Sequence, residues 1–380
     1  MMRKFQGVSF ERLAYSSFVL AGRLATGPLY GYRGSFGCIA GGALGVLRND
    51  LVDLEILRAW SWYSCYSLSG TDEQDPKDDR AKDLVGGTVC PIKIQGFCSY
   101  SVYGGPNLEY VVQFRPKSLE LKTENTVLAK QIYGTLAPEV SFMGQLGDDD
   151  ITGKKPLYTY LASRVRGVTQ LDLNLSHGCL DNSQENFASR KNLMSDMARF
   201  FALGWKSPLL IDLSYPSGLR ETYHHPGLHT RSNAILSLPM ALLYQDPSDC
   251  NIMVDETTCH LVGVIDWAEA GIGPFGLNLS ALENISGKLH LQNVCSRYKG
   301  YDTLQDTFWD TFKEEVGGVT EDDLRIIKLA RTTGLLLAHG FTSRLANDLK
   351  HVPIGEDERG RYNMLSLDGF LINLETRFEV

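Results

Sequence analysis

The pattern of apolar and polar positions changes from strand-like to helical along this chain of 380 residues. Between residues 89 and 115, short runs of β-branched and aromatic residues are separated by glycine-containing turns, which predicts three antiparallel strands. The runs at residues 138–143 and 156–165 predict two further strands. The first half of the chain is therefore expected to build an antiparallel sheet.

The segments around these strands have different patterns. Residues 47–66 carry apolar side chains at nearly helical spacing and predict a helix. Residues 70–83 are charged and contain a proline, so they are predicted to form a solvated loop. The charged residues 147–155 are predicted to form a loop between the last two strands.

The second half of the chain has mostly helical patterns. Residues 187–205 place one group of apolar side chains on the same side of a helix, namely Leu193, Met194, Met197, Phe200 and Phe201. A second stripe consists of Leu304, Phe308, Phe312 and Val316. Thr320 and Asp323 have the spacing of a capping box, which predicts a helix running to Leu337. Such stripes are core positions far more often than cofactor contacts, so they predict the hydrophobic core.

The composition is that of a globular protein with room for two lobes. Hydrophobic residues make up 43% of the chain and charged residues 22%, which is ordinary. The net charge of -8 argues against a general nucleic-acid binder, which needs a basic face, and is compatible with a cationic small molecule. No run reaches the roughly 18 consecutive apolar residues of a membrane span, so none is expected.

The spacing of the cysteines and the composition of residues 1–46 bear on the cellular location of the protein. The eight cysteines lack the paired short spacings of zinc sites, which favours reduced thiols in an intracellular protein. Residues 1–46 contain five basic residues and a single acidic one, as a mitochondrial transit peptide does. A disordered extension or a mistaken gene start is the preferred alternative. We therefore predict a cytoplasmic location, with a mitochondrial one as the alternative.

The most informative stretch lies between residues 243 and 267. Two apolar runs, 252–254 and 261–265, flank a polar turn at 255–260, which predicts an antiparallel hairpin. If Ile252 pairs with Ile265, then Asn251 and Asp266 lie opposite each other, with their Cβ atoms about 5 Å apart. Two oxygen-bearing side chains would then meet at the open end of the hairpin.

An amide beside a carboxylate suits Mg²⁺, which takes one or two carboxylates and fills its other positions with water and phosphate oxygens. Asp246 comes shortly before Asn251 and is a candidate for the base that orients an attacking hydroxyl. Kinases use an Asp, an Asn and a second Asp in this order. Asp and Asn are common in turns, so this spacing alone is a weak signal, but its combination with a hairpin ending in Ile-Asp-Trp is much rarer.

Asp246, Asn251 and Ile265-Asp266-Trp267 resemble the pattern of the aminoglycoside phosphotransferase family, which shares its fold with choline kinases and protein kinases. Ala268-Glu269-Ala270 and Pro274-Phe275-Gly276 resemble its fungal branch. This resemblance implies an α+β, two-lobed protein-kinase-like fold. The small antiparallel β lobe would span residues 47–160 after the 1–46 extension, and the larger, mainly helical lobe residues 161–380, with ATP and Mg²⁺ between them.

The resemblance also implies roles in the small lobe. Gly96 would lie in the turn that covers the nucleotide phosphates, although no G-x-G-x-x-G motif is present. The cation of the third strand aligns with Gln113, which is uncharged, so Arg115 would have to replace it. Glu124 matches the helix Glu that pairs with this cation, with a surface charge pair as the alternative for both residues. Residues 164–167 resemble the hinge that binds adenine through backbone groups.

The implied function is ATP- and Mg²⁺-dependent phosphorylation of a hydroxyl on a small molecule. Asp246 would be the catalytic residue, Asn251 and Asp266 the metal ligands, and Gly96, Arg115 and Glu124 the nucleotide-binding residues. Tyr244 and Gln245 stand where the family has His-Gly, and Pro247 restricts the backbone of Asp246. These departures leave open a catalytically impaired kinase-like protein that binds a nucleotide or ligand without phosphotransfer.

Overall fold

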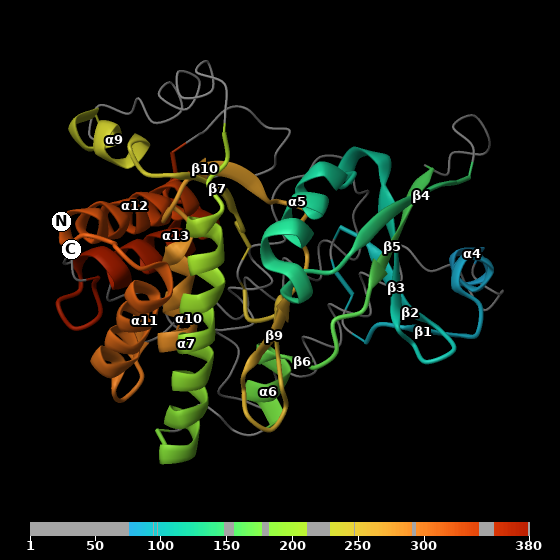
Figure 1. Cartoon of the computed structure of the whole chain (residues 1–380), viewed down its shortest axis with the longest axis horizontal. Helices are drawn as coiled ribbons and strands as arrows, with labels where there is room; N and C mark the ends of the chain where they lie inside the picture. The colour runs from blue at the N-terminus through green and yellow to red at the C-terminus, as the bar shows by residue number, and fades with distance from the viewer. Residues whose placement is uncertain are drawn as a thin grey trace. The chain divides into compact units, whose positions relative to one another are not determined.

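The computed structural model describes residues 76–93, 95–96, 98–147, 156–176, 182–210, 229–246, 248–290, 294–341 and 353–378 (Figure 1). The extension predicted at 1–46, the helix predicted at 47–66, most of the loop at 147–155 and Pro247 lie outside these residues. None of the helices so described is long and apolar enough to cross a membrane.

The N-terminal part is a five-stranded antiparallel sheet with the order β1-β2-β3-β5-β4. Its strands are β1 (Thr88–Pro91), β2 (Tyr100–Gly105), β3 (Tyr110–Pro116), β4 (Val140–Leu146) and β5 (Leu157–Ser163). Helix α5 (Thr123–Tyr133) lies between β3 and β4 in sequence, after a short helix at Lys117–Leu119 and before another at Gly134–Leu136. The predicted antiparallel sheet is confirmed.

The two faces of the sheet differ in chemistry, as strand alternation predicts. Val112 and Phe114 of β3 are fully buried in a small core with Val102. Gln113 and Arg115 alternate with them and project from the opposite face. The apolar face is covered and the polar face carries the candidate cation.

The helix that covers the apolar face corrects one prediction. Residues 70–83 were expected to be a solvated loop, but Pro76–Val85 forms helix α4. Proline begins this helix, where its missing N–H costs nothing, and acidic residues follow in the first turn. Ala81 is fully buried against the sheet, and the Tyr100 hydroxyl donates to Asp78 at 3.0 Å. Packing against the sheet thus stabilises α4, which the charged composition of this segment did not predict.

The C-terminal part is mainly helical, as predicted. Its helices are α6 (Gln170–Ser176), α7 (Gln184–Lys206), α9 (His229–Leu236), α10 (Glu283–Ser286), α11 (Tyr301–Val316), α12 (Glu321–His339) and α13 (Glu358–Leu367), with short turns at Leu279–Leu282 and Asp368–Ile372. Its strands are β6 (Val168–Thr169), β7 (Met240–Leu243), β8 (Ile252–Val254), β9 (Leu261–Val264), β10 (Gly271–Pro274), β11 (Gly287–His290) and β12 (Val294–Arg297). The predicted α+β class with an antiparallel sheet and a mainly helical part is confirmed.

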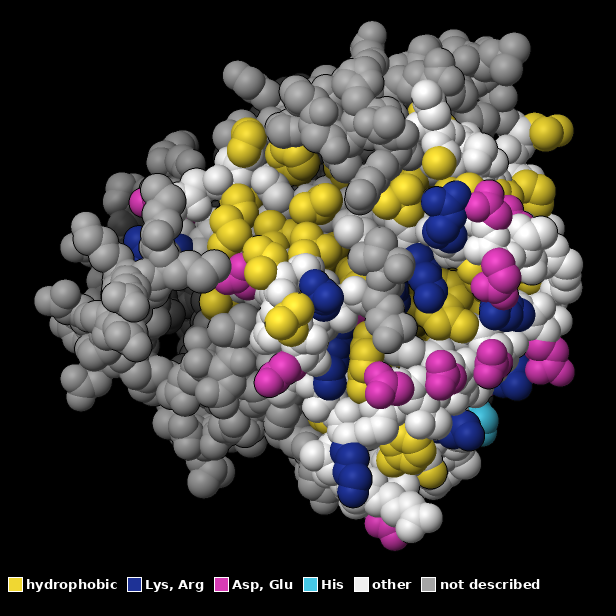
Figure 2. All heavy atoms as spheres, turned by 90° about the vertical axis from the view of Figure 1, so that its left-hand side faces the viewer, with side chains coloured by type: hydrophobic (Ala, Val, Ile, Leu, Met, Phe, Trp, Pro, Cys, Tyr) yellow, Lys and Arg dark blue, Asp and Glu magenta, His cyan; other side chains and the backbone are white. Residues whose placement is uncertain are grey.

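A large core organises most of this helical part, and a smaller separate cluster contains Leu335, Leu367, Phe370 and Phe378. The predicted stripes of α7 and α11 are buried in the large core, and the capping box of Thr320 and Asp323 begins α12 as expected. Helix α5 belongs to the same core, because Ala129 and Tyr133 are buried there. The Tyr133 ring stacks on Phe200 of α7 with ring centroids 4.3 Å apart. On the face shown in Figure 2, acidic and basic side chains are intermingled, with apolar side chains between them.

Candidate functional site

Strands β8 and β9 form the predicted hairpin, but their register differs from the expected one. Ile252 pairs with Val264, not with Ile265. The Ile265 N–H donates to the Asn251 carbonyl at 2.9 Å, so Asn251 lies opposite Ile265 and Asp266 comes one residue later. The pairing is irregular between Met253 and Val254, where the ladder shifts. A register read from the ends of two apolar runs cannot include such a shift.

Asp266 is one of three described non-glycine residues with a positive φ, together with Leu108 and Cys259. Its φ is +60°, in the left-handed region that residues other than glycine rarely adopt. Two side chains hold the peptides before it: the Tyr244 hydroxyl donates to the Ile265 carbonyl at 2.6 Å, and the Trp267 indole donates to the Val264 carbonyl at 2.9 Å. Unusual conformations held in this way cluster at functional sites. Asp266 therefore remains a candidate ligand despite the changed register.

Asp246 and Asn251 lie in direct contact. The Asn251 amide nitrogen donates to the Asp246 carboxylate at 3.0 Å and to the Asp246 carbonyl at 3.1 Å. Because the nitrogen faces Asp246, the amide oxygen faces away from it. The contact orients the candidate base and presents the amide oxygen as a candidate metal ligand.

Pairing of β7 with β10 brings the candidate base and the segment after β9 to one end of a two-stranded sheet. Leu243, shortly before Asp246, is the register partner of Gly271, which follows the segment 266–270. The Asn125 amide of helix α5 donates to the Ala270 carbonyl at 2.6 Å, which ties this segment to the N-terminal part. Sequence reasoning missed this contact, because nothing in the pattern links residues so far apart.

Tyr244 occupies the position where the family has histidine. It is almost fully buried, and burial, together with the negative charges of Asp246 and Asp266, holds the pKa of its hydroxyl well above the usual range. The hydroxyl therefore stays protonated and donates to the Ile265 carbonyl. Sequence reasoning treated this residue as a departure, whereas the structure gives it a contact that holds the Asp266 segment.

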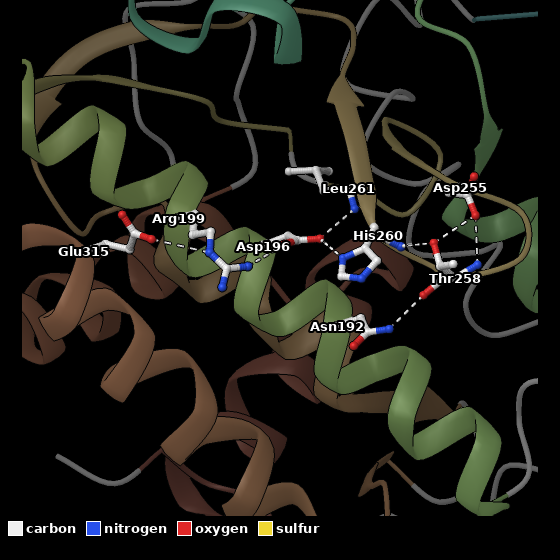
Figure 3. Close-up of polar contacts among 8 residues, drawn as sticks. All are labelled: Asn192, Asp196, Arg199, Asp255, Thr258, His260, Leu261 and Glu315. Carbon is white, nitrogen blue, oxygen red and sulfur yellow. Dashed lines mark hydrogen bonds and ion pairs between the residues drawn. The ribbon is translucent and has the colours of Figure 1, made fainter.

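The turn of the β8–β9 hairpin is anchored on helix α7 (Figure 3). The Asp196 carboxylate accepts from the Leu261 N–H at 3.0 Å and lies 2.6 Å from Nδ1 of His260. Asn192 donates to the Thr258 carbonyl at 3.0 Å. Arg199, 2.8 Å from Asp196, also reaches Glu315 of α11 at 3.4 Å. The hairpin is thus fixed to the helices at the end opposite its candidate ligands.

Arg115 of β3 is the candidate cation. Its side chain is 5% exposed, and its Nε donates to the Leu119 carbonyl at 2.7 Å. Its Nη1 donates to the Gln113 amide oxygen at 3.2 Å. Glu124 is exposed in the first turn of α5. Arg115 and Glu124, both described, form no ion pair with each other, contrary to what the resemblance implies. Arg115 is instead held by neutral oxygens.

Cys98, in the chain between β1 and β2, is half-buried. Burial raises the pKa of its thiol most, the positive charge of Arg115 lowers it, and the negative charges of Asp266, Glu269 and Asp246 raise it further. Gly96 is exposed in the same connection.

The donor set fits a hard cation bound by few protein ligands. Across the part of the chain that is described, no three His, Cys, Asp or Glu side chains gather closely enough to hold a metal ion. Asn251 and Asp266 supply one amide and one carboxylate, a set that suits Mg²⁺ when phosphate oxygens and water complete the coordination.

No protein-family model and no curated protein sequence matches this chain. It is similar in structure to an aminoglycoside-3'-phosphotransferase of type VIII, with 15% identity, a TM-score of 0.38, and coverage of 67% of this chain and 97% of the other. It is also similar to the GDP complex of aminoglycoside 2'-phosphotransferase-IIIa, with 16% identity, a TM-score of 0.41, and coverage of 69% and 87%.

A third similar structure is an aminoglycoside phosphotransferase of Streptomyces rimosus with ADP and streptomycin, at 15% identity and a TM-score of 0.34, covering 63% of this chain and 90% of the other. All three structures are aminoglycoside phosphotransferases, the family that the motifs resemble. The narrower resemblance to the fungal branch stays a prediction. At these identities and TM-scores, the similarity does not extend to the activity of this chain.

Proposed function

We propose that this protein is a phosphotransferase that uses ATP and Mg²⁺ to phosphorylate a hydroxyl group of a small molecule. Asp246 orients the hydroxyl and accepts its proton, Asn251 and Asp266 hold Mg²⁺, and Arg115 binds the nucleotide phosphates. Catalysis then depends on positioning and charge neutralisation, with no covalent intermediate on the protein.

The observation that carries this proposal is the environment of Arg115. A guanidinium with 5% exposure is normally paired with a carboxylate, because an uncompensated buried charge is costly. Arg115 contacts only a carbonyl and an amide oxygen among the described residues. The positive charge of Arg115 and the negative charges of Asp266 and Asp246 all act on the pKa of the Cys98 thiol. An anion such as a nucleotide phosphate would supply the charge that Arg115 lacks, and Mg²⁺ would balance the carboxylates.

Gly96 and Glu124 complete the proposed nucleotide site at its edges. Gly96 lies close to Ser99, since a Cβ added to it would meet the Ser99 hydroxyl at 3.4 Å. A backbone without a side chain at this point suits the close approach of a phosphate. Glu124, in the first turn of α5, forms no ion pair with Arg115, and its charge favours the start of this helix.

The test is ATP consumption by the purified protein with Mg²⁺ and a panel of hydroxylated amines and sugars. Asp246→Asn removes the proton acceptor and is expected to lower turnover by about 10² to 10⁴-fold. Asp302→Asn changes an exposed carboxylate in the first turn of α11 and serves as the matched control, with turnover unchanged.

The alternative function is nucleotide binding without phosphotransfer, which the replacement of the family's His-Gly by Tyr244-Gln245 favours. Nucleotide binding by calorimetry, with turnover equal in Asp246→Asn and the unmodified protein, would support this alternative. Failure to bind ATP in the presence of Mg²⁺ would contradict both functions.

A further inference from the structure

We propose that Gln113 is a positioning residue, which holds the Arg115 guanidinium toward an anionic ligand without neutralising its charge. The proposal rests on the proposed function, because it concerns the same nucleotide site. It assigns a role to the residue that stands where the family places its small-lobe cation.

The orientation of the Gln113 amide follows from its neighbours. A guanidinium has only donors, so the amide oxygen must face the Arg115 Nη1, at 3.2 Å. The amide nitrogen then donates to the hydroxyls of Ser99 and Ser101, at 3.0 and 3.4 Å. Both serines are buried, so water competes little for these hydrogen bonds. The amide is therefore fixed in one orientation.

The same network reaches the turn between β1 and β2. Ser101 is the register partner of Gln113 on the neighbouring strand. The Ser101 N–H donates to the Gln95 side chain at 2.7 Å, and Gln95 donates back to the Ser101 carbonyl at 2.7 Å. Gln95 lies directly before Gly96. A continuous set of hydrogen bonds thus connects the proposed phosphate turn with the guanidinium of Arg115.

Because Gln113 is uncharged, its hydrogen bond leaves the positive charge of Arg115 unneutralised. A carboxylate in place of Gln113 would hold the guanidinium equally well but would cancel most of its attraction for an anion. With Nε on the Leu119 carbonyl and Nη1 on Gln113, Nη2 makes no hydrogen bond with any described residue. Arg115 thus keeps both its charge and a donor for phosphate oxygens.

The experiment measures the affinity of the whole protein for inorganic tripolyphosphate by calorimetry, together with the melting temperature of the unliganded protein. Gln113→Leu removes the amide, and Gln113→Glu keeps its size and its acceptor for Arg115 while adding a negative charge. We expect both variants to weaken tripolyphosphate binding by about tenfold or more. The melting temperature of Gln113→Glu should be retained, because the ion pair preserves the geometry.

Gln145→Leu is the matched control, since Gln145 is an exposed glutamine on β4, and its affinity should equal that of the unmodified protein. Unchanged affinity in both Gln113 variants would overturn the role of Gln113 and leave the proposed function standing. Equal losses in the control and in the Gln113 variants would also overturn it, because the effect would then not depend on Arg115. An unmodified protein that binds neither tripolyphosphate nor ATP would overturn the proposed function itself.

Discussion

Two regions hold groups of the proposed nucleotide site, and they do so through different contacts. One is the hairpin end with Asn251 and Asp266, and the other is the polar face of β3. At the hairpin, the residue types expected of a metal site are present, and the side chains of Tyr244 and Trp267 hold the backbone before Asp266. On β3, the expected cation is replaced by Gln113, and Arg115 is held by neutral oxygens in place of a carboxylate. The side chains proposed to bind the metal are therefore of the expected types, whereas the contacts that position Arg115 are made by other groups than expected.

The largest effect is expected from Asp266→Ala, which removes the only carboxylate of the proposed metal pair. Mg²⁺-dependent nucleotide binding should be abolished, while the fold is kept, because the side chain is exposed. Calorimetry with ATP and Mg²⁺ measures the binding, and circular dichroism the fold. Asp266→Asn, which keeps one oxygen, should give an intermediate loss. Unchanged binding in Asp266→Ala would contradict the metal assignment, and the hairpin end would then have no role in binding Mg²⁺.

A smaller effect is expected from Tyr244→Phe, which keeps the buried ring but leaves the Ile265 carbonyl without its donor. The loss of a buried hydrogen bond should lower the free energy of unfolding by about 1–3 kcal/mol. The affinity for nucleotide should fall in the presence of Mg²⁺ but not in its absence, since only the Asp266 segment is released.

Tyr110→Phe is the control for this change, because Tyr110 is an exposed tyrosine on β3. Denaturant unfolding and calorimetry with and without Mg²⁺ measure the two effects. Equal losses of affinity under both conditions would show that Tyr244 acts through general stability and not through the metal ligand.

The smallest effect is expected at the other end of the hairpin, from Asp255→Asn. Hydrogen bonds from Thr257 and Thr258 hold the pKa of the Asp255 carboxyl well below its usual range. A depressed folded pKa means that the stabilisation is present above the unfolded pKa of about 4 and is lost as the pH falls toward the folded value.

The melting temperature of Asp255→Asn should therefore lie below that of the unmodified protein at pH 7, and the difference should narrow as the pH is lowered below about 4. Thermal unfolding across this range measures it. A difference that stays constant with pH would mean that the charge of Asp255 does not stabilise the hairpin turn, leaving the contacts of α7 as its anchor.

Much of the fold could be predicted because periodicity reports directly which side of an element is buried. The strands of the sheet, the stripes of α7 and α11 and the alternation that separates Phe114 from Arg115 all follow from it. Helix α4 could not be predicted in this way, because its charged composition hides a helix that depends on packing against Tyr100.

The candidate site was predictable in its residue types but not in its contacts. The sequence motif indicated Asp246, Asn251 and Asp266, whereas the irregular register of β8 and β9 and the left-handed backbone of Asp266 leave no periodic signal. The hydrogen bonds that hold Arg115 through Gln113 could not be predicted for another reason. They depend on serine hydroxyls of a neighbouring strand, and the expectation of an ion pair with Glu124 concealed them.

The backbone conformation of Asp266 costs stability, while its side chain supplies a carboxylate to the proposed metal site. Glycine at this position would adopt the same positive φ without steric cost, so a chain selected for stability alone would gain by losing the carboxylate. Aspartate at this position, with Tyr244 and Trp267 holding the adjoining peptides, is the arrangement expected if the side chain binds a ligand, as the proposed function requires. Stabilising substitutions in this protein should therefore be sought away from this short segment.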